Sequence, residues 1–588
     1  MNILGLSFDY HEAPAVLMVD GEVVAAALEE RFSRIKHDAD LPEKTIAFCL
    51  KQMGITAAQL DHVVFYENPL LKFDRILRSA IRTFPRGNRF FVEALQSWLL
   101  LRKFEVRERI AEKTGVAPHR IHYSTHHQSH AASAFYASPF DEATILTLDG
   151  VGEFETASIS IGRGTRLEKM VSINIPHSLG LFYSAFTAFL GFHVNGGEYK
   201  VMGMAGFGQP VFAAELMKLF HLRSDGSFRL KQNYFDFLCP RTLPFRPALT
   251  EWLGPARVPD SPFRLVSEEA GDAELVATSR RYADIAASVQ RCAETVILHM
   301  ASRAVEKTGI RNLCLAGGVA LNSMANGRII RELGLPLYVH PAAGDSGGAW
   351  GAAAYYHHHV LGQPRRKATT TALLGASYGE EDIRTAIAAS GFSNVRHLPE
   401  DRDLVDTVAG LLAEGLVIGW FQGRSEWGPR ALGNRSILAD PTRPDMQRIV
   451  NERIKFREPF RPFAPVVPVE VATDYFEMPP VTGPWCPEYF MLAVHPVRPK
   501  MRTRLPAITH ADGSARVQVL SRESNPLFYD LVSAFGKLRE IPILLNTSFN
   551  LRDEPVVETP ANALRTFSYS DMDYLVLGNF VISKGITI

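Results

Sequence analysis

The sequence predicts an α/β protein, and two recurring patterns indicate this class: apolar strands that end in acidic residues, and glycine-rich turns that lie between a strand and a helix. The first pattern begins at the N-terminus, where residues 2–8 form an expected strand. Residues 15–19 and 22–27 then form a hairpin around Asp20-Gly21, because Asp-Gly is a strong signal for a two-residue turn.

The same order of elements returns in the middle of the chain. Residues 143–148 form an expected strand, and residues 156–161 lead into the turn at 162–164. Asp9 and Asp149 follow the first strand of each set. Two such halves around a cleft describe the actin-like, sugar-kinase-like architecture, in which a nucleotide lies between duplicated α/β lobes.

Bulk composition narrows the class of protein further. The 588 residues suffice for two to four domains, and 63 basic residues balance 63 acidic ones. This balance gives no global attraction to nucleic acid or to an anionic membrane. Five cysteines stand far apart without a CxxC pair, and no run of about 18 apolar residues occurs. The sequence therefore predicts a soluble, cytoplasmic protein without a disulfide framework.

A histidine cluster makes residues 124–150 the chemical focus of the first half. His126 and His130 lie four apart, so on a helix they share one face, and Asp149 approaches from a strand end. Two imidazoles and a carboxylate predict a divalent-metal site with open positions. Gln128 stands where a zinc protease would carry glutamate, which excludes the HExxH pattern. The alternative is that the histidines lie on the polar face of a helix start.

Glycine-rich turns follow two later strands. Residues 311–315 run into Ala316-Gly317-Gly318, between helices expected at 283–307 and 322–332, and such turns let backbone N–H groups approach a phosphate. The strand at 336–340 ends near Asp345, which could supply a second carboxylate to the metal or cap the next helix.

Residues 71–110 are expected to be an inserted helical pair, broken at Pro85-Arg86-Gly87. The segment carries ten Lys/Arg against four acids, with apolar residues at helical spacing. The segment either packs its apolar face on the core and exposes its basic face to solvent, or it binds an anionic or amphipathic acceptor.

The second half begins after a linker at 362–367, with a helix expected at 404–414 and a strand at 415–421. Basic side chains then stand on separate loops, joined by hydroxyl and amide groups: Arg424, Arg430, Arg435, Lys455, Arg457, Arg461, Arg516, Asn546, Ser548 and Asn550. Such a set is what recognition of several phosphates requires. Surface salt bridges are the alternative.

Eight motifs occur in one order along the whole chain: HHxxHA with a later strand-end aspartate, GEYKVMGMA, AGGVALN, GDSGGAWGAA, GPRALGNRSILADP, KFREPFRPFAP, DGSARVQ and LLNTSFN. In these motifs the chain resembles the NodU/CmcH/TobZ family of ATP-dependent O-carbamoyltransferases.

The resemblance implies a two-stage enzyme. An N-terminal actin-like domain (1–361) would carry the transfer site, and a C-terminal YrdC-like domain (362–588) would form carbamoyladenylate from carbamoyl phosphate and ATP, with Mg²⁺ accompanying the nucleotide. Fe²⁺ or another divalent metal would assist transfer to a hydroxyl of a small natural product or sugar, with release of AMP.

The resemblance also implies roles for individual residues. The metal ligands would be His126, His130, Asp149 and Asp345, with His127 beside them. The activating phosphates would meet Arg430, Lys455, Arg461 and Arg516, with Asn546 and Ser548 nearby. The adenylate in the transfer site would lie against Lys200, Gly203, Gly317, Gly318 and Asn322. His11 would accept the hydroxyl proton, and Lys36 would stabilise the leaving phosphate.

Three other readings compete with this one. The tRNA threonylcarbamoyl-adenosine transferase system resembles both halves of the chain. A protein that binds tRNA is expected to carry excess positive charge, whereas the net charge of this sequence is zero. Hydrogenase-maturation carbamoyltransferases carry zinc-ribbon CxxC motifs that this sequence lacks. A non-catalytic, nucleotide-sensing actin-like protein would not need the second anion set. We therefore expect a small-molecule partner, no nucleic acid and no membrane, and the sequence is compatible with a homodimer.

Overall fold

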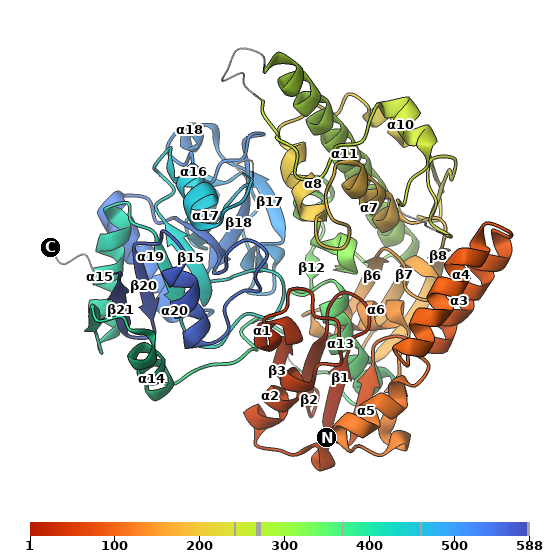
Figure 1. The fold of residues 1–588 in the computed structure, drawn as a ribbon, viewed down its shortest axis with the longest axis horizontal. Helices are drawn as coiled ribbons and strands as arrows, with labels where there is room; N and C mark the ends of the chain where they lie inside the picture. Colours follow the sequence, from red (N-terminus) through yellow and green to blue (C-terminus); the bar gives the residue numbers. More distant parts are fainter. Residues whose placement is uncertain (240–242, 266–271, 367, 459–460, 585–588) are drawn as a thin grey trace. The chain divides into compact units, whose positions relative to one another are not determined.

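The computed structural model describes residues 1–239, 243–265, 272–366, 368–458 and 461–584. The chain forms two compact units (Figure 1). Unit 1 contains Met1–His11, Met18–Glu22 and Thr56–Lys367, and unit 2 contains Glu12–Leu17, Val23–Ile55 and Ala368–Ile588. Lys367, the last residue of the expected linker, lies outside the described residues.

Two five-stranded sheets dominate the first 360 residues. The first has the order β3-β2-β1-β4-β5 and the second the order β12-β11-β6-β7-β8. Their strands are β1 (Asn2–Leu6), β2 (Pro14–Val19), β3 (Glu22–Leu28), β4 (His62–Phe65), β5 (Ile121–Tyr123), β6 (Glu142–Leu148), β7 (Glu155–Arg163), β8 (Arg166–Asn174), β11 (Leu313–Ala316) and β12 (Leu337–Val339). A short pair, β9 (Phe220–Leu222) and β10 (Phe228–Leu230), stands apart from them.

The two sheets repeat one arrangement. In each, the first strand in the sequence, β1 or β6, is central, with the next two strands on one side and two later strands on the other. The later strands pair in parallel, β1 with β4 and β5 beyond it, and β6 with β11 and β12 beyond it. This duplicated order confirms the α/β class and is the layout expected of actin-like lobes.

The helices of unit 1 include those that the sequence predicts at 283–307 and 322–332 and in the insertion. They are α3 (Pro69–Arg82), α4 (Gly87–Leu100), α5 (Val106–Thr114), α6 (His126–Ala137), α7 (Leu179–Phe189), α8 (Glu198–Ala205), α9 (Ala213–Met217), α10 (Pro247–Leu253), α11 (Ala273–Thr308), α12 (Ser323–Arg328) and α13 (Asp345–Ala354). Helix α11 begins ten residues before its predicted start, because residues 273–282 continue the helical spacing of its buried face.

Helices α6 and α13 pack against each other through small residues. Nearly every side chain of both helices is buried, and most of them are alanine, serine or glycine. At Gly351 an added Cβ would overlap the backbone oxygen of Ser129, so the two main chains approach as closely as the absence of a side chain allows. The main chains themselves therefore set the spacing between the helices.

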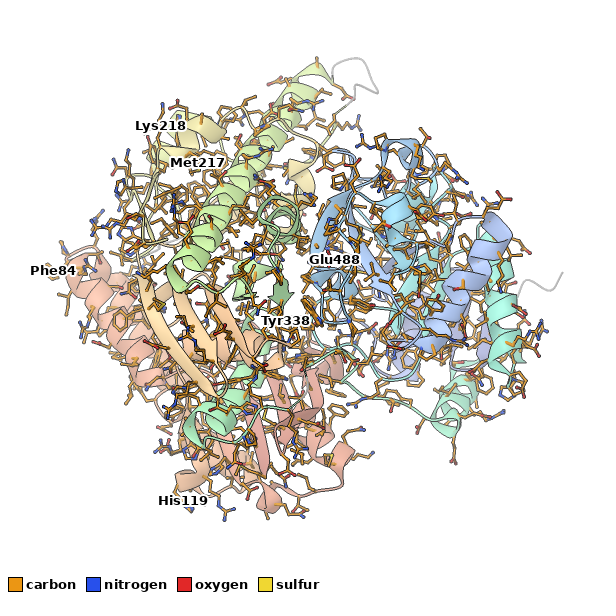
Figure 2. All side chains as sticks on the ribbon, turned by 180° about the vertical axis from the view of Figure 1, so that it is seen from behind. Phe84, His119, Met217, Lys218, Tyr338 and Glu488 are labelled. Atoms are coloured by element: carbon orange, nitrogen blue, oxygen red, sulfur yellow. The ribbon has the colours of Figure 1, made fainter. Side chains whose placement is uncertain are left out.

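The insertion forms the expected helical pair, in which α3 and α4 lie antiparallel and side by side (Figure 1). Asn68 caps α3 by accepting hydrogen bonds from the backbone of Leu70 and Leu71. Phe73, Trp98 and Phe104 pack together within the insertion. Phe84, in the turn between the helices, points away from the unit and is 72% exposed (Figure 2).

Unit 2 is built on a mixed nine-stranded sheet of order β13-β21-β20-β14-β15-β19-β16-β18-β17. Its strands are β13 (Val395–His397), β14 (Ile418–Phe421), β15 (Arg435–Ala439), β16 (Ala464–Pro468), β17 (Ala493–Pro496), β18 (Ser514–Leu520), β19 (Leu544–Ser548), β20 (Tyr574–Leu577) and β21 (Phe580–Ser583). Helices α15 (Asp401–Ala413) and α19 (Pro526–Arg539) pack together and contribute to a buried core that also contains Trp420 and Leu544.

The other helices of unit 2 have between 3 and 11 residues each. They are α1 (Glu29–Ser33), α2 (Glu43–Met53), α14 (Glu380–Ser390), α16 (Met446–Arg448), α17 (Ala472–Tyr475), α18 (Pro499–Arg502) and α20 (Pro560–Ser568). Helices α1 and α2 lie in residues 23–55, which group with unit 2, and the domain boundary at 361/362 stays a prediction. No helix in the described ranges is long and apolar enough to cross a membrane.

Candidate active site

Four side chains of unit 1 converge on one point: His126, His130, Asp149 and Asp345 each offer an atom within 4.8 Å of those of the others. Their positions follow from the fold. The histidines share one face of α6, Asp149 ends β6, and Asp345 begins α13, which is packed against α6. Sequence reasoning named all four residues, and the structure brings them together.

The distances describe a compact nitrogen and oxygen cluster. The Nε2 atoms of His126 and His130 lie 3.0 Å apart. Oδ2 of Asp149 lies 2.8 Å from Nε2 of His126 and 3.8 Å from Nε2 of His130. Oδ1 of Asp345 lies 3.5 Å from both nitrogens. Both histidines and Asp345 are buried, and Asp149 is partly buried.

The histidines and carboxylates of the cluster shift one another's pKa values. Burial by itself would raise the pKa of Asp149, but hydrogen bonds with His126 and His130 hold it well below its usual value. Burial would lower the pKa of His126, whereas Asp345 and Asp149 raise it well above the usual value. Each carboxylate therefore stabilises positive charge placed beside it.

The donor set fits a divalent cation. Two imidazole nitrogens and two carboxylate oxygens suit iron, zinc or a similar metal and leave coordination positions for a substrate. Nδ1 of His126 and of His130 are buried without a hydrogen-bond partner among the described residues. Histidines that present Nε2 to a metal carry their proton on Nδ1, so both rings are placed to act as Nε2 ligands.

His127 serves the fold rather than the cluster. Its Nδ1 lies 2.7 Å from the hydroxyl of Thr147, and its Nε2 lies 3.0 Å from the carbonyl oxygen of Glu155. Burial, and then the neighbouring His126 and His130, hold its pKa well below the usual value. A neutral His127 thus fastens α6 to β6 and β7, and both of its ring nitrogens are occupied.

The glycine-rich turns lie against the same cluster. The backbone N–H of Gly318 donates to Oδ1 of Asp149 at 3.0 Å. Gly317 has φ of +92°, and an added Cβ would overlap the carbonyl oxygen of Leu148, so only glycine fits there. The Asn322 side chain caps α12 and exchanges hydrogen bonds with Gln290, which gives this predicted nucleotide contact a structural task.

The remaining predicted transfer-site residues occupy different surroundings. Lys200 and Gly203 lie on α8, where Lys200 stands over the ring of Phe192 at 5.7 Å. Nδ1 of His11 lies 3.8 Å from Oδ2 of Asp345, which places this imidazole at the edge of the cluster. Asp9, the counterpart of Asp149 in the first sheet, instead forms a two-point ion pair with Arg109.

Two acidic residues that sequence reasoning missed support the cluster. Both carboxylate oxygens of Glu153 accept the backbone N–H of His126, and one also accepts that of Asn68. Glu67 follows β4, and its Oε2 lies 3.8 Å from Nδ1 of His126. The signal for Glu67 was available in the sequence, because it is a further acid that closely follows a parallel strand, as Asp9 and Asp149 are.

Unit 2 contains a separate cluster of cations. Lys455 is buried, and its ammonium donates to the carbonyl and hydroxyl of Ser548 and to Oδ1 of Asn550 at 2.6 to 3.1 Å. Burial, followed by the charges of Arg457 and Arg461, lowers its pKa well below the usual value. A buried ammonium beside two guanidinium groups favours an anion as its neighbour.

Arg516 belongs to the same cluster. Burial, and then the charges of Arg430, Arg457 and Arg461, hold its pKa well below the usual range. Asn546 donates to Oε1 of Gln518 at 2.8 Å, while its own buried Oδ1 has no hydrogen-bond partner within the described part of the chain. The predicted residues Arg430, Lys455, Arg461, Arg516, Asn546 and Ser548 thus lie on the elements around one charged region.

Two arginines of the predicted anion set have structural roles. Arg435 is fully buried, stacks on Phe421 at 3.6 Å and donates to several backbone carbonyl oxygens, including that of Gln422. Arg424 likewise donates to the carbonyl oxygens of Gly375 and Leu374. The expectation that these two read phosphates was wrong, because main-chain acceptors that no motif reveals occupy their guanidinium groups.

Lys36 lies in the part of the N-terminal segment that groups with unit 2. Its ammonium pairs with Glu30 at 3.0 Å, and its charge is among those that lower the pKa of Lys455. These neighbours place Lys36 with the cations of unit 2, and its role in the transfer step stays a prediction.

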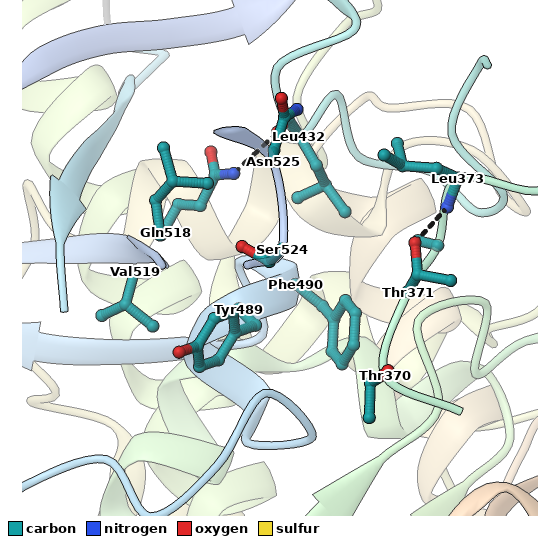
Figure 3. A pocket seen from close by; sticks show the side chains of 12 residues that line it. Thr370, Thr371, Leu373, Leu432, Tyr489, Phe490, Gln518, Val519, Ser524 and Asn525 are labelled. Atoms are coloured by element: carbon teal, nitrogen blue, oxygen red, sulfur yellow. Dashed lines mark hydrogen bonds between the residues drawn. The ribbon is translucent and has the colours of Figure 1, made fainter. Parts of the chain in front are cut away.

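A cavity of about 30 Å³ also opens in unit 2 (Figure 3). Thr371, Leu432, Tyr489, Phe490 and Gln518 are among its lining residues, and Gln518 donates to the carbonyl oxygen of Leu432 at 2.9 Å. The space is too small for a nucleotide.

Comparisons with known proteins find similarity along both halves of the chain. Residues 2–354 match the family model described as the carbamoyltransferase N-terminus, and residues 409–584 match that of the carbamoyltransferase C-terminus. Nodulation protein NolNO of Sinorhizobium fredii is 36% identical over 98% of this chain and 79% of its own length. Nodulation protein NolO of Bradyrhizobium diazoefficiens is 37% identical over 78% of each chain.

Solved structures are more distant. HypF from T. kodakarensis is 15% identical, with a TM-score of 0.31 over 62% of this chain and 48% of its own. ROK hexokinase from Thermus thermophilus is 14% identical, with a TM-score of 0.28 over 60% of this chain and 98% of its own. At such scores the fold assignment rests on the sheets of this chain. Since the family models cover both of its halves, the chain belongs to the carbamoyltransferase family and is an enzyme that transfers carbamoyl groups.

Proposed function

We propose that the protein is an ATP-dependent O-carbamoyltransferase that activates a carbamoyl group in unit 2 and transfers it in unit 1 to a hydroxyl of a small natural product or sugar. The observation that carries the proposal is that one chain holds two chemically different centres. The buried cations around Lys455 and Arg516 suit phosphates, and the cluster of His126, His130, Asp149 and Asp345 suits a divalent metal.

Activation would proceed among the cations of unit 2. Carbamoyl phosphate and water give carbamate and phosphate, a carbamate oxygen attacks the α-phosphorus of ATP, and pyrophosphate leaves to give carbamoyladenylate. Arg430, Lys455, Arg461 and Arg516 would bind the negative oxygens, since a guanidinium can hold a phosphate through two parallel hydrogen bonds. Mg²⁺ bound to ATP would neutralise further charge.

Transfer would use the residues around the four-ligand cluster. The acceptor oxygen attacks the carbamoyl carbon, the bond to AMP breaks, and the hydroxyl proton passes to a base. His11, whose Nδ1 lies 3.8 Å from Oδ2 of Asp345, would accept that proton. Fe²⁺ or another divalent metal held by His126, His130, Asp149 and Asp345 would supply positive charge where negative charge develops.

The adenylate would lie against the glycine-rich turns. Gly317 and Gly318 present backbone rather than side chain, and Gly318 already donates to the ligand Asp149. Lys200, Gly203 and Asn322 are the further nucleotide contacts in this proposal. The mixed anhydride hydrolyses readily, so both steps need surroundings that exclude water.

Product analysis tests the proposal. The purified protein is incubated with ATP and carbamoyl phosphate, and the nucleotides and pyrophosphate are separated and quantified. Carbamoyl-phosphate-dependent release of pyrophosphate and AMP is expected, whereas a sugar kinase would release ADP. A screen of hydroxylated natural products with radiolabelled carbamoyl phosphate would then identify the acceptor. Absence of pyrophosphate under all these conditions would refute the activation step.

A further inference from the structure

Glu67 lies between the metal-ligand cluster and the inserted helices. It follows β4, is 4% exposed and is not one of the four convergent ligands. Its Oε2 lies 3.8 Å from Nδ1 of His126, and its Oε1 accepts a hydrogen bond from the ammonium of Lys72 at 2.6 Å. The carboxylate therefore faces a histidine of the cluster on one side and a lysine of α3 on the other.

The histidine needs such a partner. Nε2 of His126 points to Asp149 and His130, so as a ligand it offers its lone pair there and carries the proton on Nδ1. That Nδ1 is buried and makes no hydrogen bond to any described residue. The Glu67 carboxylate, one small side-chain movement away, is the acceptor placed to receive its N–H.

Lys72 is the charged partner of this acceptor. Its ammonium lies 2.6 Å from Oε1 of Glu67, and this positive charge favours the carboxylate form of the buried side chain. Lys72 is itself only 16% exposed and stands over the ring of Tyr10 at 5.2 Å. Because Lys72 lies on α3, the insertion contacts Glu67, which adjoins the metal-ligand cluster.

A cavity of about 80 Å³ adjoins this pair. Glu67, Lys72, Tyr10, Trp98 and Lys103 are among its lining residues, and within the insertion Trp98 lies on α4 and Lys103 in the turn after that helix. Lys72, which pairs with Glu67, therefore also lines this cavity, whose volume suits a small substituent.

We propose that Glu67 is a positioning residue that fixes His126 in the tautomer and orientation required of a metal ligand, and that Lys72 of the insertion holds Glu67 in place. This inference rests on the proposed metal site. A carboxylate that accepts the second ring N–H of a ligating histidine raises the basicity of that histidine and restricts its rotation. Loss of such a carboxylate commonly weakens metal binding 10- to 100-fold.

Metal binding, rather than turnover, tests the inference. Metal-free protein is titrated with Co²⁺ in a calorimeter and in a spectrometer, whose visible bands report the geometry of the site. Glu67→Gln, which keeps the shape of the side chain and removes the charge, should weaken Co²⁺ binding about 10- to 100-fold and change the spectrum. Lys72→Met should weaken it by a smaller factor of about 3 to 10, and Lys72→Arg should restore it.

Two controls separate positioning from general structure. Lys169→Met breaks a comparable lysine–glutamate pair of unit 1, in which the ammonium lies 2.7 Å from Glu155, and should leave Co²⁺ affinity and spectrum unchanged. In a His126→Ala background Glu67→Gln should have no further effect, because the residue acts through that imidazole. Circular dichroism of each metal-free variant verifies folding, and Glu67→Asp provides a second, milder variant.

The outcomes distinguish the inference from the proposed function. If wild-type protein binds Co²⁺ and both Glu67→Gln and Lys72→Met bind it with the same affinity and spectrum, the inference is overturned and the metal site stands. If the wild type itself binds no divalent metal, the proposed metal site fails, and the inference fails with it. An additive loss in the His126→Ala background would also overturn the inference, since Glu67 would then act elsewhere.

Discussion

The Nε2 atoms of His126 and His130 face each other at 3.0 Å, closer than two protonated imidazoles tolerate without a shared partner. Asp149 and Asp345 approach the same two nitrogens. A cation between these groups would replace the shared protons, and removal of one imidazole should therefore damage transfer selectively.

His130→Ala should retain carbamoyl-phosphate-dependent release of pyrophosphate and lose carbamoylation of the acceptor. The reason is that the phosphate-binding cations belong to unit 2, whereas His130 belongs to unit 1. Pyrophosphate and labelled acceptor are measured in parallel, with the exposed His221→Ala as the matched control. Loss of both activities in a folded His130→Ala protein would contradict this division of labour.

Arg461→Ala should abolish adenylate formation and leave metal binding intact. A guanidinium that holds a phosphate at two points is worth roughly 2 to 3 kcal/mol, so even Arg461→Lys should reduce kcat/KM about 30- to 150-fold. Pyrophosphate release over a range of carbamoyl phosphate concentrations gives kcat and KM, and the exposed Arg453→Ala is the control. Near-normal turnover of the lysine variant would show that Arg461 is structural.

Binding of ATP should be coupled to proton uptake through Lys455. Burial and the charges of Arg457 and Arg461 lower its pKa in the free protein, while a bound phosphate favours the ammonium. Affinity should therefore fall as pH rises through the lowered pKa of the free protein. Calorimetry between pH 8 and 9.5 in buffers of different ionisation enthalpy measures the uptake, because the phosphates of ATP do not titrate there. Uptake that persists in Lys455→Met would assign it to another group.

Arg78→Glu or Arg82→Glu should raise the acceptor's KM and leave acceptor-independent AMP formation unchanged. Both residues lie exposed on α3, and exposed Ile81 and Phe84 lie beside them in the chain. Arg89→Glu, on α4 and paired with Glu93, is the control. A change in oligomeric mass with unaltered acceptor kinetics would identify the insertion as a subunit interface instead.

Gly351→Ala should destabilise the protein by about 1 to 3 kcal/mol and weaken metal binding, because its Cβ would overlap the backbone of α6. Gly410→Ala, in the interior of α15, meets open space and should stabilise by about 0.5 to 1 kcal/mol. Chemical denaturation of both variants gives the comparison. Equal stability of the two would show that α6 and α13 can separate at little cost.

The sequence predicts turns, helices and strand ends better than contacts between residues that are far apart in the chain. The hairpin at Asp20-Gly21, the helical pair around Pro85 and the strand ends at Asp149 and Asp345 follow from turn chemistry and periodicity, and the structure places each of them as expected. The convergence of Asp149 and Asp345 could be anticipated because they follow β6 and β12 of one sheet, whose parallel strands β6, β11 and β12 end at one edge. The two histidines could be added because residues four apart share one face of a helix.

The errors concern side chains whose partners are backbone atoms or belong to remote segments. Arg424 and Arg435 resemble phosphate ligands in a glycine-rich motif, yet remote carbonyl oxygens occupy them. Glu67 was missed although it closely follows a strand as Asp149 does, and its contacts with Lys72 and His126 appear only in the folded chain.

The contact between α6 and α13 implies a limit on how this enzyme can diversify. Helices that touch through main-chain atoms have no side chains between them whose exchange could shift one against the other gradually. The distance from His130 to Asp345 is therefore insensitive to most single substitutions. If the exposed pair α3 and α4 borders the acceptor, as we propose, homologues and laboratory variants would acquire new acceptors there while the chemistry of the cluster stays constant.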